Sequence, residues 1–131
     1  MSSQEPTAYA FNRTRRLYLA RELCIAGTHW SRFCGLMGKA AAKFRAGQGL
    51  WIVPSRGVHT LAMRFPIDVV YLDKNKIVLY MKENLRPWRV APLNLQTTSV
   101  LELPASVLGA TGTAVGDEIE IALGPQEGSP Q

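Results

Sequence analysis

The sequence predicts a mainly β fold: a single compact, sandwich-like or barrel-like domain with one short helix in its N-terminal half. Three observations support this prediction: many short apolar runs, prolines and glycines between them, and a single segment with a clear helical period. A chain of 131 residues has the length of one domain. We expect the domain at 14–123, between flexible tails at 1–13 and 124–131 that lack periodicity.

Eight segments have the pattern of strands. In residues 17–25, apolar side chains alternate with less apolar ones, which predicts one long strand or two short ones. Asp73 to Lys76 supplies a polar turn between two β-branched runs, which predicts a hairpin. The expected strands are 17–25, 50–53, 58–64, 67–72, 77–82, 88–90, 99–103 and 118–123.

In residues 30–44 the apolar side chains recur at the helical spacing of i, i+3, i+4 and i+7. Gly38 favours an end to this helix, so we expect about ten residues. Residues 105–111 could form a second short helix. The apolar stripe of the first helix comprises Trp30, Phe33, Cys34, Met37, Ala40, Ala41 and Phe44.

The charge is unevenly distributed. Residues 1–56 hold nine Lys and Arg against two acids, whereas residues 57–131 hold six against eight. A basic surface could bind nucleic acid, but no nucleic-acid motif accompanies it, so we expect a solvated basic face and no nucleic-acid partner. The chain contains no apolar run of about 18 residues that could span a bilayer. The first 30 residues lack the pattern of a secretory signal, so we expect a cytoplasmic protein.

Motifs for common chemistries are absent from the sequence. It contains no dinucleotide-binding fingerprint, phosphate-binding loop, zinc-protease motif or hydrolase nucleophile elbow. Cys24 and Cys34 stand ten residues apart without further cysteine pairs, and we expect reduced thiols. We therefore expect neither a metal nor a cofactor.

The central block 58–73 resembles a known signature. It is similar to the H-T-F-x-M-R-F-P-I-D-V-V-F-L-D core of a bacterial and archaeal family known as domain of unknown function 192. Segments 32–39, 49–52, 100–105 and 115–117 resemble, in the same order, the family's R-x-x-G-L-M-x-R, G-L-L-I, V-L-E-L-P-A-G and V-G-D. The resemblance implies a compact, mostly β domain with a short helix near the N-terminus, and no established activity. Many relatives carry export signals.

Two positions depart from the family pattern. Ala62 replaces the glycine or aromatic residue that usually precedes the methionine, and Ser106 takes a glycine position. Neither change conflicts with the fold, and both bear on the shape of any pocket.

His59 and Asp68 form the sharpest candidate pair. Alternation places each among apolar neighbours, where a desolvated carboxylate needs a cation or hydrogen-bond donors. As a functional pair they would act as a general base or would orient a ligand in a cleft. In the structural alternative, Asp68 accepts backbone N–H bonds from the Phe65-Pro66 turn while His59 packs inside. Both possibilities stay open.

Several further side chains could complete a site. Arg32 and Arg64 could bind an anion, or could instead form internal salt bridges to Asp68 or Glu83. Trp88 and Arg89 could form a platform for a sugar. We expect Trp51 in the core and Cys34 buried and inert.

Taken together, these features favour a monomeric binding or accessory module with a small-molecule or carbohydrate-like ligand in a cleft near the central block. One alternative is a small hydrolase-type enzyme with His59 as base and Asp68 as its orienter. Another is a basic adaptor for an anionic partner, whose binding would weaken steeply with salt.

Overall fold

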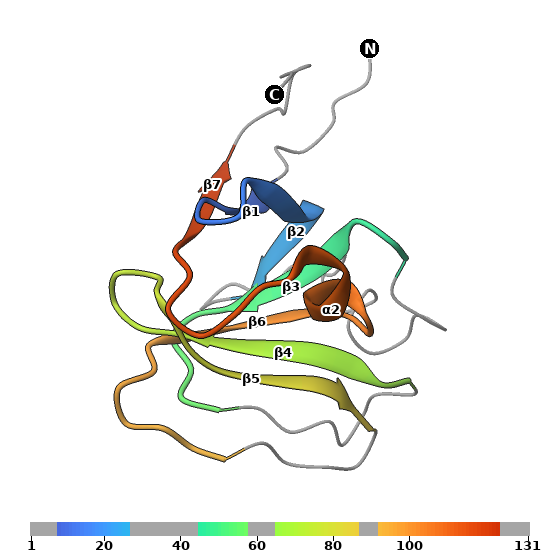
Figure 1. Ribbon diagram of the computed structural model, residues 1–131. Helices are drawn as coiled ribbons and strands as arrows, with labels where there is room; N and C mark the ends of the chain where they lie inside the picture. The colour runs from blue at the N-terminus through green and yellow to red at the C-terminus, as the bar shows by residue number, and fades with distance from the viewer. Residues whose placement is uncertain (1–7, 27–44, 58–64, 87–91, 124–131) are drawn as a thin grey trace.

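The computed structural model describes residues 8–26, 45–57, 65–86 and 92–123 (Figure 1). One helix, α2 (Val107–Thr111), lies within these ranges. The strands are β1 (Ala8–Asn12), β2 (Leu17–Ala26), β3 (Gln48–Ile52), β4 (Ile67–Leu72), β5 (Val78–Leu85), β6 (Ser99–Pro104) and β7 (Ile119–Leu123).

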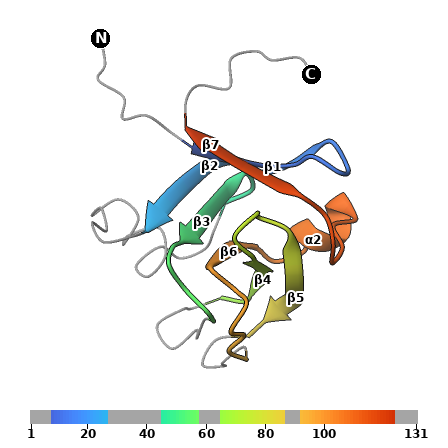
Figure 2. The same cartoon turned by 90° about the vertical axis from the view of Figure 1, so that its left-hand side faces the viewer.

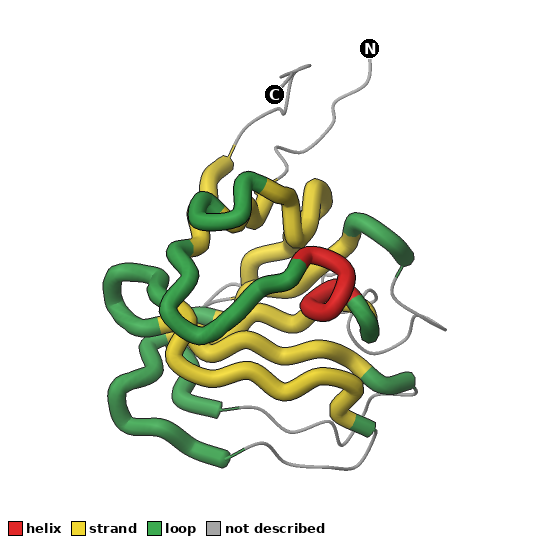
Figure 3. The backbone as a smooth tube through the Cα atoms, viewed as in Figure 1, coloured by secondary structure: helices red, strands yellow, loops and turns green. Residues whose placement is uncertain are grey.

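The strands form one sheet in the order β5-β4-β6-β3-β2-β1-β7. Strands β2 and β3 run parallel, and the other neighbouring pairs are antiparallel. The sheet curls into a half-barrel, and α2 lies on one side of it (Figures 2 and 3). The mainly β prediction is therefore confirmed, and its architecture is a single curled sheet rather than a sandwich of two.

Most described strands lie where alternation predicted them, but one was missed. Residues 8–12, which the sequence analysis assigned to the tail 1–13, form β1 between β2 and β7. The inward side chains of β1 are Ala8, Ala10 and Asn12, which give only a weak apolar signal although all three are buried. The expected strands 58–64 and 88–90, the expected helix beginning at Trp30 and the tail 124–131 lie outside the described residues.

The predicted hairpin joins β4 to β5. The Asp73 carboxylate accepts hydrogen bonds from the backbone N–H groups of Asn75 at 2.8 Å and Ile77 at 3.0 Å. This side-chain bond to the following backbone is how an aspartate initiates a tight turn.

The two edge strands meet at one end of the half-barrel. Ile77 and Glu118 form a β-bridge, and the N–H of Ile119 donates to the carbonyl of Lys76 at 2.9 Å. The approach of the chain to β7 thus joins the start of β5, which brings the two ends of the sheet together at this point.

The sheet has two buried faces. The face on which α2 packs is called the helix face, and the opposite one the outer face. The buried helix-face cluster comprises Ala8, Ala10, Leu19, Ala20, Leu23, Val70, Leu72, Val78, Leu101, Leu103, Leu108 and Ile119. The buried outer-face cluster comprises Cys24, Leu50, Ile67, Val69, Tyr71, Leu85 and Val100. Because both faces are buried, the central strands read as continuous apolar runs.

A polar cluster holds β1 against the approach to β7. Asp117 is 4% exposed and accepts hydrogen bonds from Arg15 Nε and Asn12 Nδ2, each at 2.9 Å, and from the Ala114 N–H at 3.0 Å. Burial alone would raise the pKa of Asp117, but these donors outweigh it and hold the pKa below its usual value. The ionised carboxylate is therefore the form that stabilises the fold.

We predict that Asp117→Asn lowers the free energy of unfolding by about 1 to 3 kcal/mol at pH 7, because charge-assisted hydrogen bonds are lost. A depressed pKa stabilises the fold above the unfolded-state value and loses that effect as pH falls through the folded-state value. The gap between wild type and variant should consequently close below about pH 4. Urea unfolding at pH 7 and in acid measures the stability difference and its decrease at low pH, with the exposed Glu118→Gln as a control. A gap that persists in acid would contradict the assignment.

Candidate functional site

Asp68 is fully buried in β4 and is held by backbone donors from two other elements. Its Oδ1 accepts the N–H of Asn84 in β5, and its Oδ2 accepts the N–H of Leu108 in α2, each at 2.9 Å. Asn84 has a φ of 53° and lies where the register between β4 and β5 shifts. The carboxylate therefore binds an irregular point in β5 and the first turn of α2 at once.

This arrangement resembles the structural alternative of the sequence analysis, with one correction. Backbone N–H groups do hold the Asp68 carboxylate, but the donors belong to β5 and α2 and not to the Phe65-Pro66 turn. Both donors are distant from Asp68 along the chain, at separations of 16 and 40 residues, so the sequence around Asp68 does not reveal them.

The other predicted site residues lie outside the described ranges, namely His59, Arg64, Arg32, Trp88 and Arg89. Cys34 lies outside them too. Trp51, expected in the core, is partly buried against the helix-face cluster.

Sequence reasoning missed Glu102 as a candidate. It lies in the middle of β6 and is 5% exposed. Its cross-strand partners are Leu50 in β3 and Val69 in β4, both of the outer-face cluster, and paired residues share a face of a sheet. Glu102 is thus a carboxyl group set into the buried outer face. A single acid between two leucines in an apolar strand was the available signal.

The row of paired residues that crosses the outer face through Glu102 is largely apolar. From β2 to β5 it runs Cys24, Leu50, Glu102, Val69 and Lys82. Lys82 is exposed and lies two strands from Glu102, or about 10 Å at the usual spacing between strands. No ion pair joins this lysine to the carboxyl, and Lys82 makes no contribution to the shift in the pKa of Glu102.

Aromatic rings lie on the same face. Tyr71 is fully buried, its hydroxyl donates to the carbonyl of Pro92, and its ring centroid lies 4.9 Å from that of Tyr80. Tyr80 and Phe65 are only partly buried against the cluster. Phe65 and β4 belong to the central block that the sequence analysis singled out, so the block does contribute to this face.

Burial raises the pKa of Glu102 to about 7. Within the described part of the chain, no hydrogen bond or ion pair offsets this desolvation. A carboxyl with such a pKa can hold or release a proton at neutral pH, and it can bind a hydrogen-bond donor that enters its surroundings. Among the described residues, no three His, Cys, Asp or Glu side chains are grouped closely enough to hold a metal ion.

We predict that Glu102→Gln changes how stability depends on pH. The folded state binds the proton more tightly than the unfolded state, whose pKa is near 4.5, so stability is lost as pH rises towards and through 7. At pH 8 the free energy of unfolding of the variant should exceed that of wild type by up to about 3 kcal/mol. At pH 4 the two proteins should differ little in stability.

Urea unfolding across this range measures the difference between wild type and Glu102→Gln. The exposed Glu83→Gln serves as the matched control and should follow the wild type. A difference that does not grow with pH would show that the carboxyl is not desolvated.

We predict the opposite effect for Asp68→Asn. The amide retains one acceptor oxygen but turns an N–H₂ group towards a backbone N–H, so stability should fall by about 2 to 4 kcal/mol. Asp73→Asn is the control, because one Asp73 oxygen accepts both bonds of its turn and the amide keeps that oxygen. Thermal and urea unfolding check this, and equal stabilities for the two variants would refute the structural role of Asp68.

No helix in the described part of the chain is long and apolar enough to cross a membrane.

Among solved structures, one similar protein is of unknown function and comes from Novosphingobium aromaticivorans. It has a TM-score of 0.69 and 16% identity, with 88% of this chain and 83% of that one covered. A proposed transcription regulator from Sinorhizobium meliloti has a TM-score of 0.66 and 16% identity, with coverage of 92% and 95%. At this identity the likeness shows the fold alone.

Sequence comparison identifies the family. Two archaeal proteins named UPF0127 are each 29% identical over 114 residues, one from Thermococcus sibiricus and one from Pyrococcus furiosus. The match covers 83% of this chain in both cases, and 71% and 94% of the respective relatives. The family model DUF192, described as "Uncharacterized ACR", matches residues 11–121. The chain therefore belongs to the DUF192 family, a family of unknown function.

Proposed function

We propose that the protein is a binding module whose ligand site lies on the outer face of the sheet around Glu102. The observation that carries this proposal is a buried carboxyl group among apolar and aromatic side chains, without a partner among the described residues. Raising a carboxyl pKa from 4.5 to about 7 corresponds to about 3 kcal/mol of destabilisation of the charged form. A ligand that brings a donor to this carboxyl would remove much of that cost.

The surroundings favour a small molecule with O–H or N–H donors and an apolar surface. A carboxylate accepts hydrogen bonds from hydroxyl groups, and the partly exposed Tyr80 and Phe65 offer ring carbon to the apolar side of a sugar. A carbohydrate-like ligand is therefore our first choice.

Further residues enter the proposal on sequence grounds. His59, Arg64, Arg32, Trp88 and Arg89 are proposed as additional ligand contacts, and their roles stay predictions. Asp68 is proposed as a structural residue instead, because both carboxylate oxygens already accept backbone N–H bonds. The basic-adaptor hypothesis also stays a prediction.

Calorimetric titration with neutral monosaccharides, glucose and N-acetylglucosamine first, tests the proposal. At pH 7 the Glu102 carboxyl is about half ionised, and a donor lowers its pKa, so binding should release up to about half a proton. Titrations in buffers of different ionisation enthalpy measure that release. Glu102→Gln should stay folded yet show neither binding nor proton release.

The controls separate this outcome from its alternatives. Glu83→Gln should bind like wild type. If wild type binds no sugar, the carbohydrate proposal fails, and if Glu102→Gln binds as wild type does, the site lies elsewhere. Uptake of a proton would instead indicate a ligand that offers an acceptor to the protonated carboxyl.

The same carboxyl favours one second candidate, a hydrolase. A general base works best with a pKa near the operating pH, and that of Glu102 is about 7. Assays with p-nitrophenyl esters and glycosides would then give a rate that rises through an apparent pKa near 7 in the wild type and is lost in Glu102→Gln. A rate equal to that of buffer alone excludes this candidate for those substrates.

A further inference from the structure

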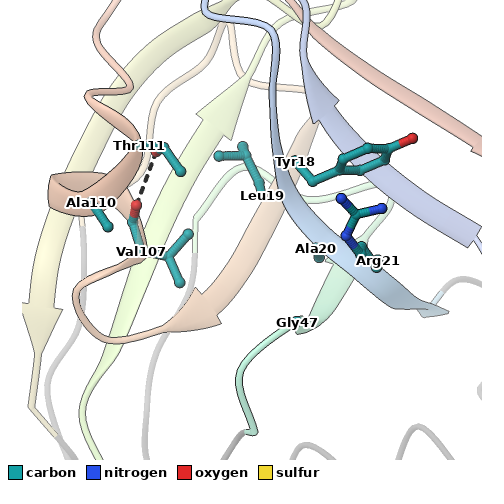
Figure 4. Close-up of a pocket in the computed structure, with 8 residues that line it drawn as sticks. All are labelled: Tyr18, Leu19, Ala20, Arg21, Gly47, Val107, Ala110 and Thr111. Carbon is teal, nitrogen blue, oxygen red and sulfur yellow. Dashed lines mark hydrogen bonds between the residues drawn. The ribbon is translucent and has the colours of Figure 1, made fainter. Parts of the chain in front are cut away.

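A second concave site lies on the other side of the sheet. A groove of about 220 Å³ runs between α2 and β2 (Figure 4). Leu19, Ala20 and Val107 in its wall also contribute to the helix-face core, so it is separate from the surroundings of Glu102 on the outer face. The lining residues are Tyr18, Leu19, Ala20, Arg21, Gly47, Val107, Ala110 and Thr111.

The walls of the groove are mainly carbon. Leu19 and Val107 face each other across it, and Ala110 extends the helix wall (Figure 4). The Thr111 hydroxyl bonds to the Val107 carbonyl at 2.9 Å and lies 2.7 Å from the Thr113 hydroxyl, so its hydrogen-bonding capacity is directed within the fold. The groove therefore suits an apolar group.

Among the described residues that line the groove, Arg21 carries the charged side chain. It is exposed, and its guanidinium carbon lies 3.9 Å from the centre of the Tyr18 ring. Stacking orients the plane of the guanidinium, whose N–H groups point sideways within that plane and match the two oxygens of a carboxylate. The rim of the groove thus has the charge and geometry for a single anionic group.

We infer that the groove binds a small amphipathic monoanion, with its apolar body between α2 and β2 and its carboxylate on Arg21. A medium-chain or aryl carboxylate has this chemistry. The volume lies below the roughly 300 to 1,000 Å³ typical of pockets for drug-sized ligands, which favours a short molecule.

Titration with octanoate, and in parallel with uncharged 1-octanol, tests the inference on the full chain. Wild type should bind octanoate at least tenfold more tightly than 1-octanol. Arg21→Gln should abolish this preference, whereas Arg13→Gln, which changes an exposed arginine outside the lining, should preserve it. Ala110→Trp should fill the groove and weaken both probes at least tenfold.

Other outcomes overturn the inference. These are no octanoate binding by wild type, equal losses in Arg21→Gln and Arg13→Gln, or unchanged binding by Ala110→Trp. Should Ala110→Trp fail to fold by circular dichroism, Ala110→Leu takes its place. Glu102→Gln should bind octanoate normally, so failure here and failure of the proposed outer-face site are distinguishable.

Discussion

The fold depends on one carboxylate that three elements share. Asp68 belongs to β4, next to the edge strand β5, and its two oxygens accept backbone N–H groups from β5 and from α2. Without it, two backbone donors would lose their partner, one of them on the buried Leu108. Because α2 supplies Leu108 to the helix-face core and forms one wall of the groove, this single side chain positions both.

Three buried acids in the sheet and its borders differ in a way that bears on function. Asp68 is held by two backbone donors, and Asp117 by Asn12, Arg15 and a backbone N–H. Asp68 connects β4 to β5 and α2, and Asp117 connects the approach to β7 with β1, so these hydrogen bonds account for the burial of both acids. Glu102 has no equivalent partners among the described residues, so its carboxyl connects β6 to no other described element by a hydrogen bond or an ion pair. The described part of the fold therefore does not account for its burial.

The sequence predicted the described strands where alternation or a continuous apolar run was strong, as in residues 67–72 and 99–103. It did not predict β1, whose inward residues include two alanines, nor the parallel pairing of β2 with β3. Periodicity encodes which side chains share a face but not which distant strands become neighbours. The partners of Asp68 were missed for the same reason, since backbone N–H groups leave no mark in a sequence.

Some residues in the segments that resemble family motifs have a structural role in the described fold, and Glu102 does not. A Cβ on Gly49 would lie 3.0 to 3.1 Å from side chains of Ala20, Leu23 and Leu103, so close packing of β3 requires glycine there. Gly116 has a φ of 97° in the turn that presents Asp117 to its donors. Glu102 is different, because an apolar residue would satisfy β6 better at neutral pH. A residue that costs stability and secures no contact within the described fold is where a binding function has its most direct physical support.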